Sequence, residues 1–365
     1  MRAVTISNIY ANKEPVKAGN QLFEHSGNIS AEENISLWKQ QNYDIVPYIM
    51  DMVIEEDDII LFSDRVNFWR GWRFLCKRRW LKNTICILIE SDVVDRKCGK
   101  RILMKMKDAF PVIMTYQDDM VDNAKYFKYW PTINSNICMI KSPVAWQDRG
   151  LAAIVCGNKR YHEVPGELYT ERKRIVDYFE EHSEYLFGVA GKRWRGYRNW
   201  KGIINSKAEL YHNYKFAICL ENSRANGYIT EKIFDCFKYG IVPVYGGAYN
   251  INDYIPKECY IDYFQFKSLD EMVNYLQNMN EAEYNQYLSA IEIFLQSEQL
   301  HQFGQEAQVK RIYQAIHVLP DSFHVKWTAW INMLIFVRIY ELRKVLKEKV
   351  LLLKGKLRNK LCRPC

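Results

Sequence analysis

The sequence predicts an α/β protein with parallel sheets, organised in two domains. The chain has 365 residues, well above the roughly 150 of a typical single domain. Short apolar runs alternate with helical stretches along most of its length, which is the pattern of parallel strands joined by crossover helices. Apolar residues make up 48% of the chain, which is enough to fill two buried cores.

The first half contains one marked helix and three candidate strands. Ser30 and Glu33 have the spacing of a capping box, so we expect a helix from there to about residue 41. The expected strands occupy residues 58–63, 84–89 and 109–114. A polar, turn-like stretch at 146–150 ends this half, so we assign residues 1–150 to a first domain.

The second half repeats the alternation more regularly. The expected strands occupy residues 151–156, 185–189, 215–220 and 241–245. The expected helices occupy residues 166–182, 231–239 and 268–279, with further polar helices through 317. Gly240 has the place of a C′ glycine after its helix. We assign residues 151–325 to a second domain and residues 326–365 to a tail.

Residues 220–232 place polar side chains at the carboxyl end of a buried strand. Glu221 and Asn222 follow the apolar run directly, at the edge where open α/β sheets bind ligands. Thr230 is a suitable N-cap for the next helix, whose free N–H groups favour a phosphate. Lys232 in the first turn opposes the helix dipole, and an anionic ligand would resolve that conflict. An ordinary strand–turn–helix with a solvated lysine is the alternative.

Six short motifs follow one another between residues 221 and 268. They are Glu221-Asn-Ser223, Tyr228-Ile-Thr-Glu-Lys232, Val242-Pro-Val-Tyr-Gly246, Tyr254-Ile-Pro256, Tyr260-Ile-Asp262 and Phe266-Lys-Ser268. In this order they resemble the α1,3/α1,4-fucosyltransferases of glycosyltransferase family 10, bacterial type. Upstream, Met114-Thr-Tyr-Gln-Asp-Asp119 is similar to the family segment Tyr-Arg-x-Asp-Ser-Asp, with departures at Gln117 and Asp119.

The resemblance covers about residues 85–280 and implies a GT-B architecture. Two Rossmann-like domains would face a cleft, with an acceptor on the first and a nucleotide sugar on the second. Outside the range of the resemblance, the spacing of apolar and basic residues in the tail predicts a C-terminal basic amphipathic helix.

The resemblance also implies roles for individual residues. Arg172 and Lys232 would contact the diphosphate of GDP-fucose, and both cations are suited to stabilise charge on a leaving diphosphate. Glu231 resembles the ribose ligand, and Asn222 and Tyr228 match positions around the phosphates and fucose. For Arg172 the alternative is a solvent-facing helix residue, because two further basic residues follow it directly.

Glu90 is the candidate general base by the same resemblance. It follows the apolar run 85–89, so we expect it at a strand's carboxyl end, facing the cleft. A carboxylate is ionised at neutral pH and could take a proton from an acceptor hydroxyl. A water-exposed acid at the strand end is the alternative, and Asp92 and Asp95 are the substitutes for the base.

The resemblance implies an inverting transfer of fucose from GDP-β-L-fucose, with the 3-OH of N-acetylglucosamine as the acceptor. The acceptor would belong to a cell-surface glycan such as a lipopolysaccharide O-antigen. The chain has no Asp-x-Asp pair, so we expect no metal site and no obligate cofactor, with a divalent ion at most stimulatory. The alternatives are a family member with another donor or acceptor sugar, or a non-catalytic nucleotide-sugar or glycan-binding protein.

The net charge of +8 lies in the tail. Residues 326–365 hold 11 Lys and Arg against 2 Asp and Glu, whereas the other 325 residues hold 40 against 41. A nucleic-acid enzyme would carry its basic surface on the folded body, so we expect no nucleic-acid partner.

Apolar residues in the tail recur at spacings of three and four, on one face of a helix. They are Ile335, Ile339, Leu342, Leu346, Val350, Leu353 and Leu357. Basic residues occupy the other face, which predicts peripheral binding to an anionic membrane surface. The alternatives are a coiled coil that forms a homodimer and a stripe packed on the body.

Residues 1–17 lack the apolar core of a secretory signal, and no apolar run reaches the roughly 18 residues of a membrane span. Cys86, Cys156 and Cys219 lie in apolar runs, where reduced cysteines act as small hydrophobic residues. We therefore expect a cytoplasmic protein, peripheral on the inner face of the inner membrane.

Overall fold

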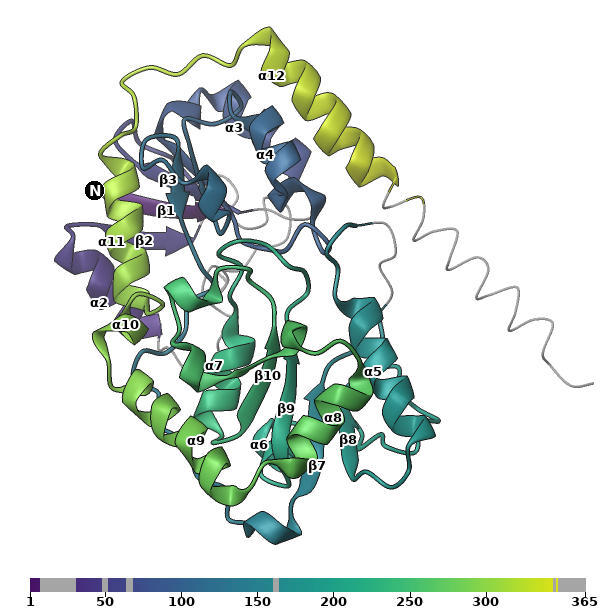
Figure 1. Ribbon diagram of the computed structural model, residues 1–365. Helices are drawn as coiled ribbons and strands as arrows, with labels where there is room; N and C mark the ends of the chain where they lie inside the picture. Colours follow the sequence, from purple (N-terminus) through teal and green to yellow (C-terminus); the bar gives the residue numbers. More distant parts are fainter. Residues whose placement is uncertain (7–30, 48–51, 64–67, 160–163, 344–345, 347–365) are drawn as a thin grey trace, which may run out of the picture.

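The structure is a computed structural model that describes residues 1–6, 31–47, 52–63, 68–159, 164–343 and 346. Within these ranges the chain forms two α/β domains, each built on a parallel sheet (Figure 1). The fold class predicted from the sequence is confirmed.

The first domain holds a six-stranded sheet with the order β2-β1-β3-β4-β5-β6. Its strands are β1 (Arg2–Ile6), β2 (Asp44–Pro47), β3 (Ile59–Phe62), β4 (Thr84–Leu88), β5 (Val112–Thr115) and β6 (Tyr126–Lys128). Helices α3 (Phe68–Arg78) and α4 (Lys100–Met106) cover one face, and α2 (Ala31–Gln40) covers the other.

The predicted strands of the first half are confirmed, but β5 begins later than the predicted 109. Pro111 has no N–H to donate to a strand ladder, so pairing starts after it. The helix predicted from Ser30 is present, although Ser30 itself lies outside the described residues.

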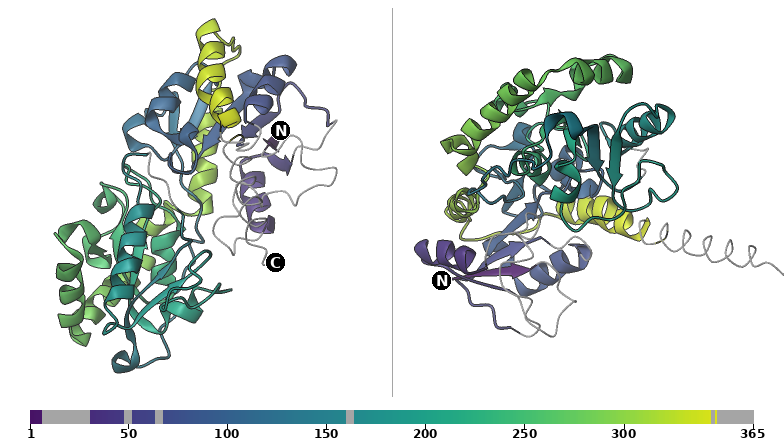
Figure 2. Two further views of the ribbon diagram at one scale, coloured as in Figure 1. Left: turned by 90° about the vertical axis from the view of Figure 1, so that its right-hand side faces the viewer. Right: turned by 90° about the horizontal axis from the view of Figure 1, so that it is seen from below.

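The second domain holds a five-stranded sheet with the order β11-β10-β9-β7-β8. Its strands are β7 (Gly150–Val155), β8 (Phe187–Ala190), β9 (Tyr214–Leu220), β10 (Val242–Gly246) and β11 (Ile261–Asp262). Helices α5 (Tyr169–Glu181) and α8 (Leu269–Asn278) cover one face, and α6 (Ala208–Tyr211), α7 (Glu231–Lys238) and α9 (Glu281–Leu295) cover the other (Figure 1). The teal and green second domain forms a lobe separate from the blue first domain (Figure 2). Each strand and helix predicted between 151 and 279 is present.

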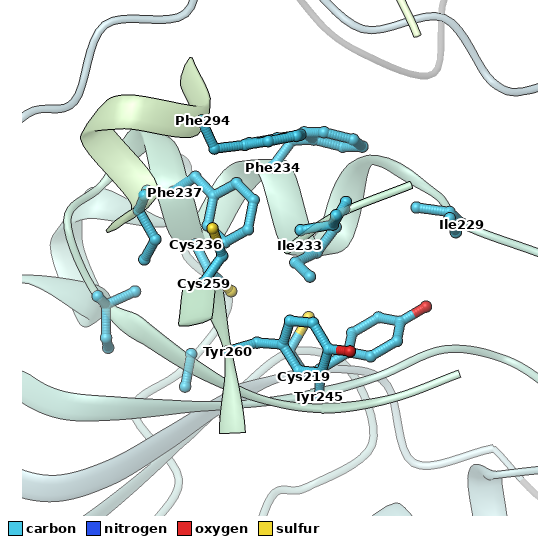
Figure 3. Packing of buried hydrophobic residues seen from close by; sticks show 14 of the residues in the cluster. Cys219, Ile229, Ile233, Phe234, Cys236, Phe237, Tyr245, Cys259, Tyr260 and Phe294 are labelled. Carbon is cyan, nitrogen blue, oxygen red and sulfur yellow. The ribbon is translucent and has the colours of Figure 1, made fainter. Parts of the chain in front are cut away.

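Helix α7 is held firmly against this sheet. Ile233, Phe234 and Phe237 on its inner face are buried with Tyr245 of β10 and Phe294 of α9 (Figure 3). This packing fixes the direction of the helix, so the side chains in its first turn keep a set position relative to the end of β9.

The chain returns to the first domain after α10 (Glu298–His301). Val309, Ile312 and Ala315 of α11 (Gln305–Ile316) share a core with α2 and the first sheet. Helix α12 (Trp327–Asn332) and its π-helical continuation Met333–Arg338 pack on α3 and α4. The predicted boundary at 325 therefore differs from the packing, in which residues from about 305 belong with the first domain.

The tail helix docks by a face that the sequence did not single out. Trp330 packs with its ring centroid 4.5 Å from that of Trp72, and Met333 and Val337 are fully buried. The predicted stripe points outward. Its described members are Ile335, Ile339, Leu342 and Leu346, which are 46%, 38%, 50% and 63% exposed. The stripe is thus not packed on the body, and its predicted members beyond 346 lie outside the described residues.

Within the part of the chain that the structure describes, no helix combines the length and apolar character required to span a bilayer.

Candidate functional site

The carboxyl end of β9 meets the N-terminus of α7 around one buried carboxylate. Glu221 follows β9 and is 0% exposed. Its side chain accepts hydrogen bonds from the Thr230 N–H at 2.8 Å and from the Thr230 hydroxyl. Thr230 occupies the predicted N-cap position, but its hydroxyl binds Glu221 instead of capping the helix. Strand and helix are therefore joined by a side chain.

Lys232 points into the same cluster. Its ammonium lies 2.9 Å from Glu221 and 3.6 Å from Glu231. Burial acts to lower the pKa of Lys232, but the two carboxylates outweigh burial and raise the pKa above its ordinary value. Lys232 therefore stays charged at physiological pH. The conflict between this lysine and the helix dipole, from which we predicted an anionic ligand, is partly resolved by Glu221 itself.

Arg172 reaches the same edge from α5. It is 5% exposed, and its guanidinium donates to the Leu220 carbonyl at 2.6 Å and to Asn222 Oδ1 at 3.1 Å. The two basic residues that follow Arg172 form other ion pairs. Lys173 pairs with Asp177 and Arg174 pairs with Glu171. The register of α5 thus selects Arg172, and the solvent-facing alternative for this residue is wrong.

Asn222 and Tyr228 extend this chain of hydrogen bonds to the first domain. Asn222 Nδ2 donates to the Tyr228 hydroxyl at 3.3 Å. Tyr228 is 2% exposed, and its ring centroid lies 4.7 Å from that of Tyr116 in the first domain. Burial raises the pKa of Tyr228, and the Glu221 and Glu90 carboxylates add to the shift. Tyr228 therefore keeps its proton and can act as a hydrogen-bond donor.

Glu90 lies two residues beyond β4 and is half-buried. It lies at the carboxyl edge of the first sheet, as does Tyr116, whose ring packs on Tyr228 of the second domain. The Glu90 carboxylate is also one cause of the raised pKa of Tyr228. The exposed-acid alternative is therefore not what the structure shows. The second domain supplies cations here, and the first domain supplies a carboxylate.

The two substitutes for Glu90 have different surroundings. Asp92 is half-buried beside the Ser223 hydroxyl, and burial raises its pKa. Asp95 is 5% exposed and pairs with the buried Lys97 at 2.9 Å. Because Asp95 is buried and already paired within the first domain, it is unsuited to accept a proton from a substrate.

Sequence reasoning did not identify the partners that hold the site together. Ser91 and Tyr116 contact Tyr228 from the first domain. Both follow strands, at β4 and β5, so their place at the carboxyl edge of the sheet was the available signal.

No three His, Cys, Asp or Glu side chains among the described residues are grouped so as to hold a metal ion. A cavity of about 330 Å³, lined by Trp146, Arg149 and Tyr284 among others, lies elsewhere. Arg149 precedes β7 and Gly240, also in its lining, precedes β10, so this cavity is at the amino edge of the second sheet, opposite the candidate site.

Two parallel-sheet domains, with Arg172 and Lys232 at the carboxyl edge of the second sheet and Glu90 at the carboxyl edge of the first, have the architecture of the GT-B class of glycosyltransferase folds. Structural comparison supports this class. A crystal structure of an α1,3-fucosyltransferase with GDP aligns with a TM-score of 0.54 at 14% identity, covering 88% of this chain and 92% of that one. A second structure, with GDP-fucose, gives a TM-score of 0.53 and covers 89% and 93%.

Sequence comparison finds similarity to fucosyltransferases in the second half of the chain. Residues 162–317 match the profile described as glycosyltransferase family 10 (fucosyltransferase) C-term. An alpha-(1,4)-fucosyltransferase of Arabidopsis thaliana is 35% identical over 92 residues, which is 23% of each protein. The alpha-(1,3)-fucosyltransferase FucT of Helicobacter pylori is 33% identical over 96 residues, 26% of this chain and 20% of that protein. The chain thus covers under a quarter of these relatives' length.

Proposed function

We propose that this protein transfers fucose from GDP-fucose to a sugar hydroxyl, with inversion at the anomeric carbon. The observation that carries the proposal is the joining of Arg172, Asn222 and Tyr228 in one hydrogen-bonded chain beside Lys232, opposite Glu90. Solved proteins with this fold carry GDP and GDP-fucose, and the family profile is that of fucosyltransferases.

In the proposed mechanism, Arg172 and Lys232 bind the diphosphate and stabilise the charge that develops as it leaves. Glu231 accepts from the ribose hydroxyls. Glu90 removes a proton from the acceptor hydroxyl, whose oxygen attacks the anomeric carbon from the face opposite GDP. The new bond is α-linked, and GDP leaves with the electron pair of the broken bond.

The acceptor we propose is N-acetylglucosamine, attacked through its 3-OH, in a cell-surface glycan such as a lipopolysaccharide O-antigen. The names of the related proteins include both α1,3 and α1,4 transferases, so linkage is the quantity to measure. Purified protein should transfer fucose to lactose, N-acetyllactosamine or its β1,3 isomer, with the linkage read by NMR. Thermal shifts with GDP and UDP test the donor independently, and equal stabilisation by UDP-galactose contradicts the assignment.

We further propose that the outer face of the tail helix rests on the inner face of the cytoplasmic membrane. Ile335, Ile339 and Leu342 form an exposed apolar row, and Arg343 beside them is exposed and basic. Each basic residue near an anionic surface contributes about 1 kcal/mol, which salt weakens. A homodimer through the same row is the alternative. A salt-titrated liposome pelleting assay beside light scattering distinguishes the two.

A further inference from the structure

The two segments that cross between the domains run side by side. The first crossover, residues 129–133, follows β6, and the second, residues 302–304, precedes α11. The Ile133 N–H donates to the Phe303 carbonyl at 3.2 Å, and Ile133 pairs with Gly304 in a parallel bridge. Because both covalent connections between the domains lie in these two segments, a rotation of one domain relative to the other would change the backbone here.

Trp130 in the first crossover reaches from this hinge to the candidate site. Its indole N–H donates to the Gly227 carbonyl at 2.7 Å, in the turn just before α7. Its ring packs on Phe303 with centroids 4.6 Å apart, and the Lys128 ammonium lies 4.1 Å from the ring centroid. One buried side chain thus contacts both crossovers and the turn.

Lys128 and Asp118 reinforce the same contact from the first domain. The Lys128 ammonium donates to the carbonyls of Tyr116 at 2.8 Å and Gly227 at 3.2 Å, and its third bond goes to Asp118. All three of its N–H bonds are therefore used. The other oxygen of Asp118 accepts from Asn250 and from the Tyr254 hydroxyl, both in the second domain, at 2.8 Å.

The turn itself is shaped for this contact. Gly227 has a φ of +75°, which side chains other than glycine rarely adopt. A Cβ atom at this position would collide with Lys128 Nζ and with the Asp118 carboxylate. The Gly227 N–H is held as well, by Asn250 Oδ1 at 2.8 Å.

We propose that Trp130, Lys128 and Asp118 are positioning residues that pin the Asn226–Gly227 turn to the first domain and so set the spacing between Glu90 and the donor cations. The next residue, Tyr228, packs on Tyr116 of the first domain, and Lys232 lies four residues later in the first turn of α7. The kinetic part of this inference rests on the proposed transfer reaction.

The contacts predict which step depends on these residues. Arg172 and Lys232 are held by the second domain's own strands, helices and Glu221, so GDP should bind without the Trp130 contact. The alignment of Glu90 with the donor crosses the interface, so the chemical step should suffer. One lost buried hydrogen bond corresponds to roughly a tenfold effect.

The test is Trp130→Phe, which removes the indole N–H and keeps an aromatic ring. The matched control is Trp72→Phe, because the buried Trp72 donates to the Ala109 carbonyl at 2.9 Å entirely within the first domain. We expect kcat to fall about tenfold in Trp130→Phe while GDP affinity stays within about threefold. Hydrogen exchange should accelerate across residues 222–230 in this variant and remain unchanged there in Trp72→Phe.

Lys128→Met provides a second variant should Trp130→Phe fold poorly, and it should show the same exchange pattern. Unchanged exchange at 222–230 in both variants would overturn the inference, as would equal losses of kcat and GDP affinity. Hydrogen exchange is read on the protein without substrate. If the wild type transfers no fucose, the proposed reaction fails while the positioning of the turn is still decided.

Discussion

Glu221 and Lys232 form an ion pair of 2.9 Å directly beneath the N-terminus of α7. With the Glu221 side chain fully buried, the pair is part of the folded domain before any ligand arrives. Because Glu221 neutralises the charge of Lys232, the binding of an anionic ligand also depends on Arg172 and on the helix dipole. The lysine therefore has a structural role and a proposed catalytic role, and the two must be separated experimentally.

Lys232→Ala should lower kcat/KM by at least about 100-fold, the scale for losing a donor that stabilises developing charge. It should also lower the melting temperature, because Glu221 is left buried without its partner. The double variant Glu221→Gln with Lys232→Ala removes that unpaired charge. It should regain stability but not activity, so recovery of turnover in the double variant would show that Lys232 acts only through the fold.

Arg172→Ala should lower kcat/KM by a similar factor of about 100. Lys173→Ala is the matched control, since Lys173 is the next residue on α5 and pairs with Asp177 away from the sheet edge. Steady-state kinetics with varied GDP-fucose measure both. Equal losses in the two variants would remove Arg172 from the donor site.

Glu90→Gln should retain GDP binding and lose most transfer, because the amide keeps the shape of the side chain and cannot take a proton. Calorimetry with GDP and a transfer assay give the two quantities. Asp95→Asn should act differently, by lowering stability by about 3 kcal/mol or more, because it weakens the buried pair with Lys97. If Asp92→Asn is inactive while Glu90→Gln is active, Asp92 is the base.

Ile335→Glu should release the protein from anionic liposomes and leave its thermal stability nearly unchanged, because Ile335 is 46% exposed. Met333→Glu, two residues earlier on the same helix, should instead destabilise the fold, since it places a charge in a buried position. Pelleting and differential scanning calorimetry measure both. Wild-type protein that stays in the supernatant at low salt contradicts membrane binding.

Lys128 makes the turn before α7 sensitive to pH. Burial lowers its pKa to about 8 and Arg311 adds to the shift, while Asp118 opposes it. Trp130 and Tyr254 complete its surroundings. In the unfolded chain a lysine keeps its proton to about pH 10.4, so between pH 8 and that value the unfolded state binds more protons. The contribution of Lys128 to the free energy of unfolding therefore rises with pH across this window.

The hydrogen bonds that hold the Asn226–Gly227 turn should weaken as pH rises, because deprotonated Lys128 has two N–H groups for its three acceptors. We expect amide protection across 222–230, corrected for intrinsic exchange rates, to decrease as pH rises from about 7 to 9. Lys128→Met should remove this dependence. The same pH response in Lys128→Met would assign it to another group.

Local patterns were enough to predict the fold class and the β9–α7 segment. Apolar runs bounded by polar turns mark strands such as β4 and β9 reliably, because each is buried on both faces. Strand β6 has three residues and no such run, so its place beside β5 follows only from tertiary packing. For Arg172, sequence left three adjacent basic residues in competition, and only the register of α5 against β9 separates them.

The placement of the two domains relative to each other could not be predicted from the sequence. The contact between Trp130 and Gly227 joins residues 97 positions apart, and neither local propensity nor periodicity encodes it. The same holds for the tail, where two apolar faces share one helix. Spacing identified the row at Ile335, but Met333 and Val337 are the residues that dock, because they meet the tryptophans of α3.

Because α11 and α12 pack on the first domain, the core of that domain contains residues from both ends of the described chain, which bears on the order of folding during synthesis. Val309 and Met333 complete two cores whose strands are made some 200 residues earlier. We therefore expect the first domain to keep apolar surface exposed until α11 and α12 have been synthesised. The second sheet, with strands and covering helices all between 150 and 295, is free to reach its final state first. We therefore expect the second domain to complete its core before the first, although it is the later of the two in the sequence.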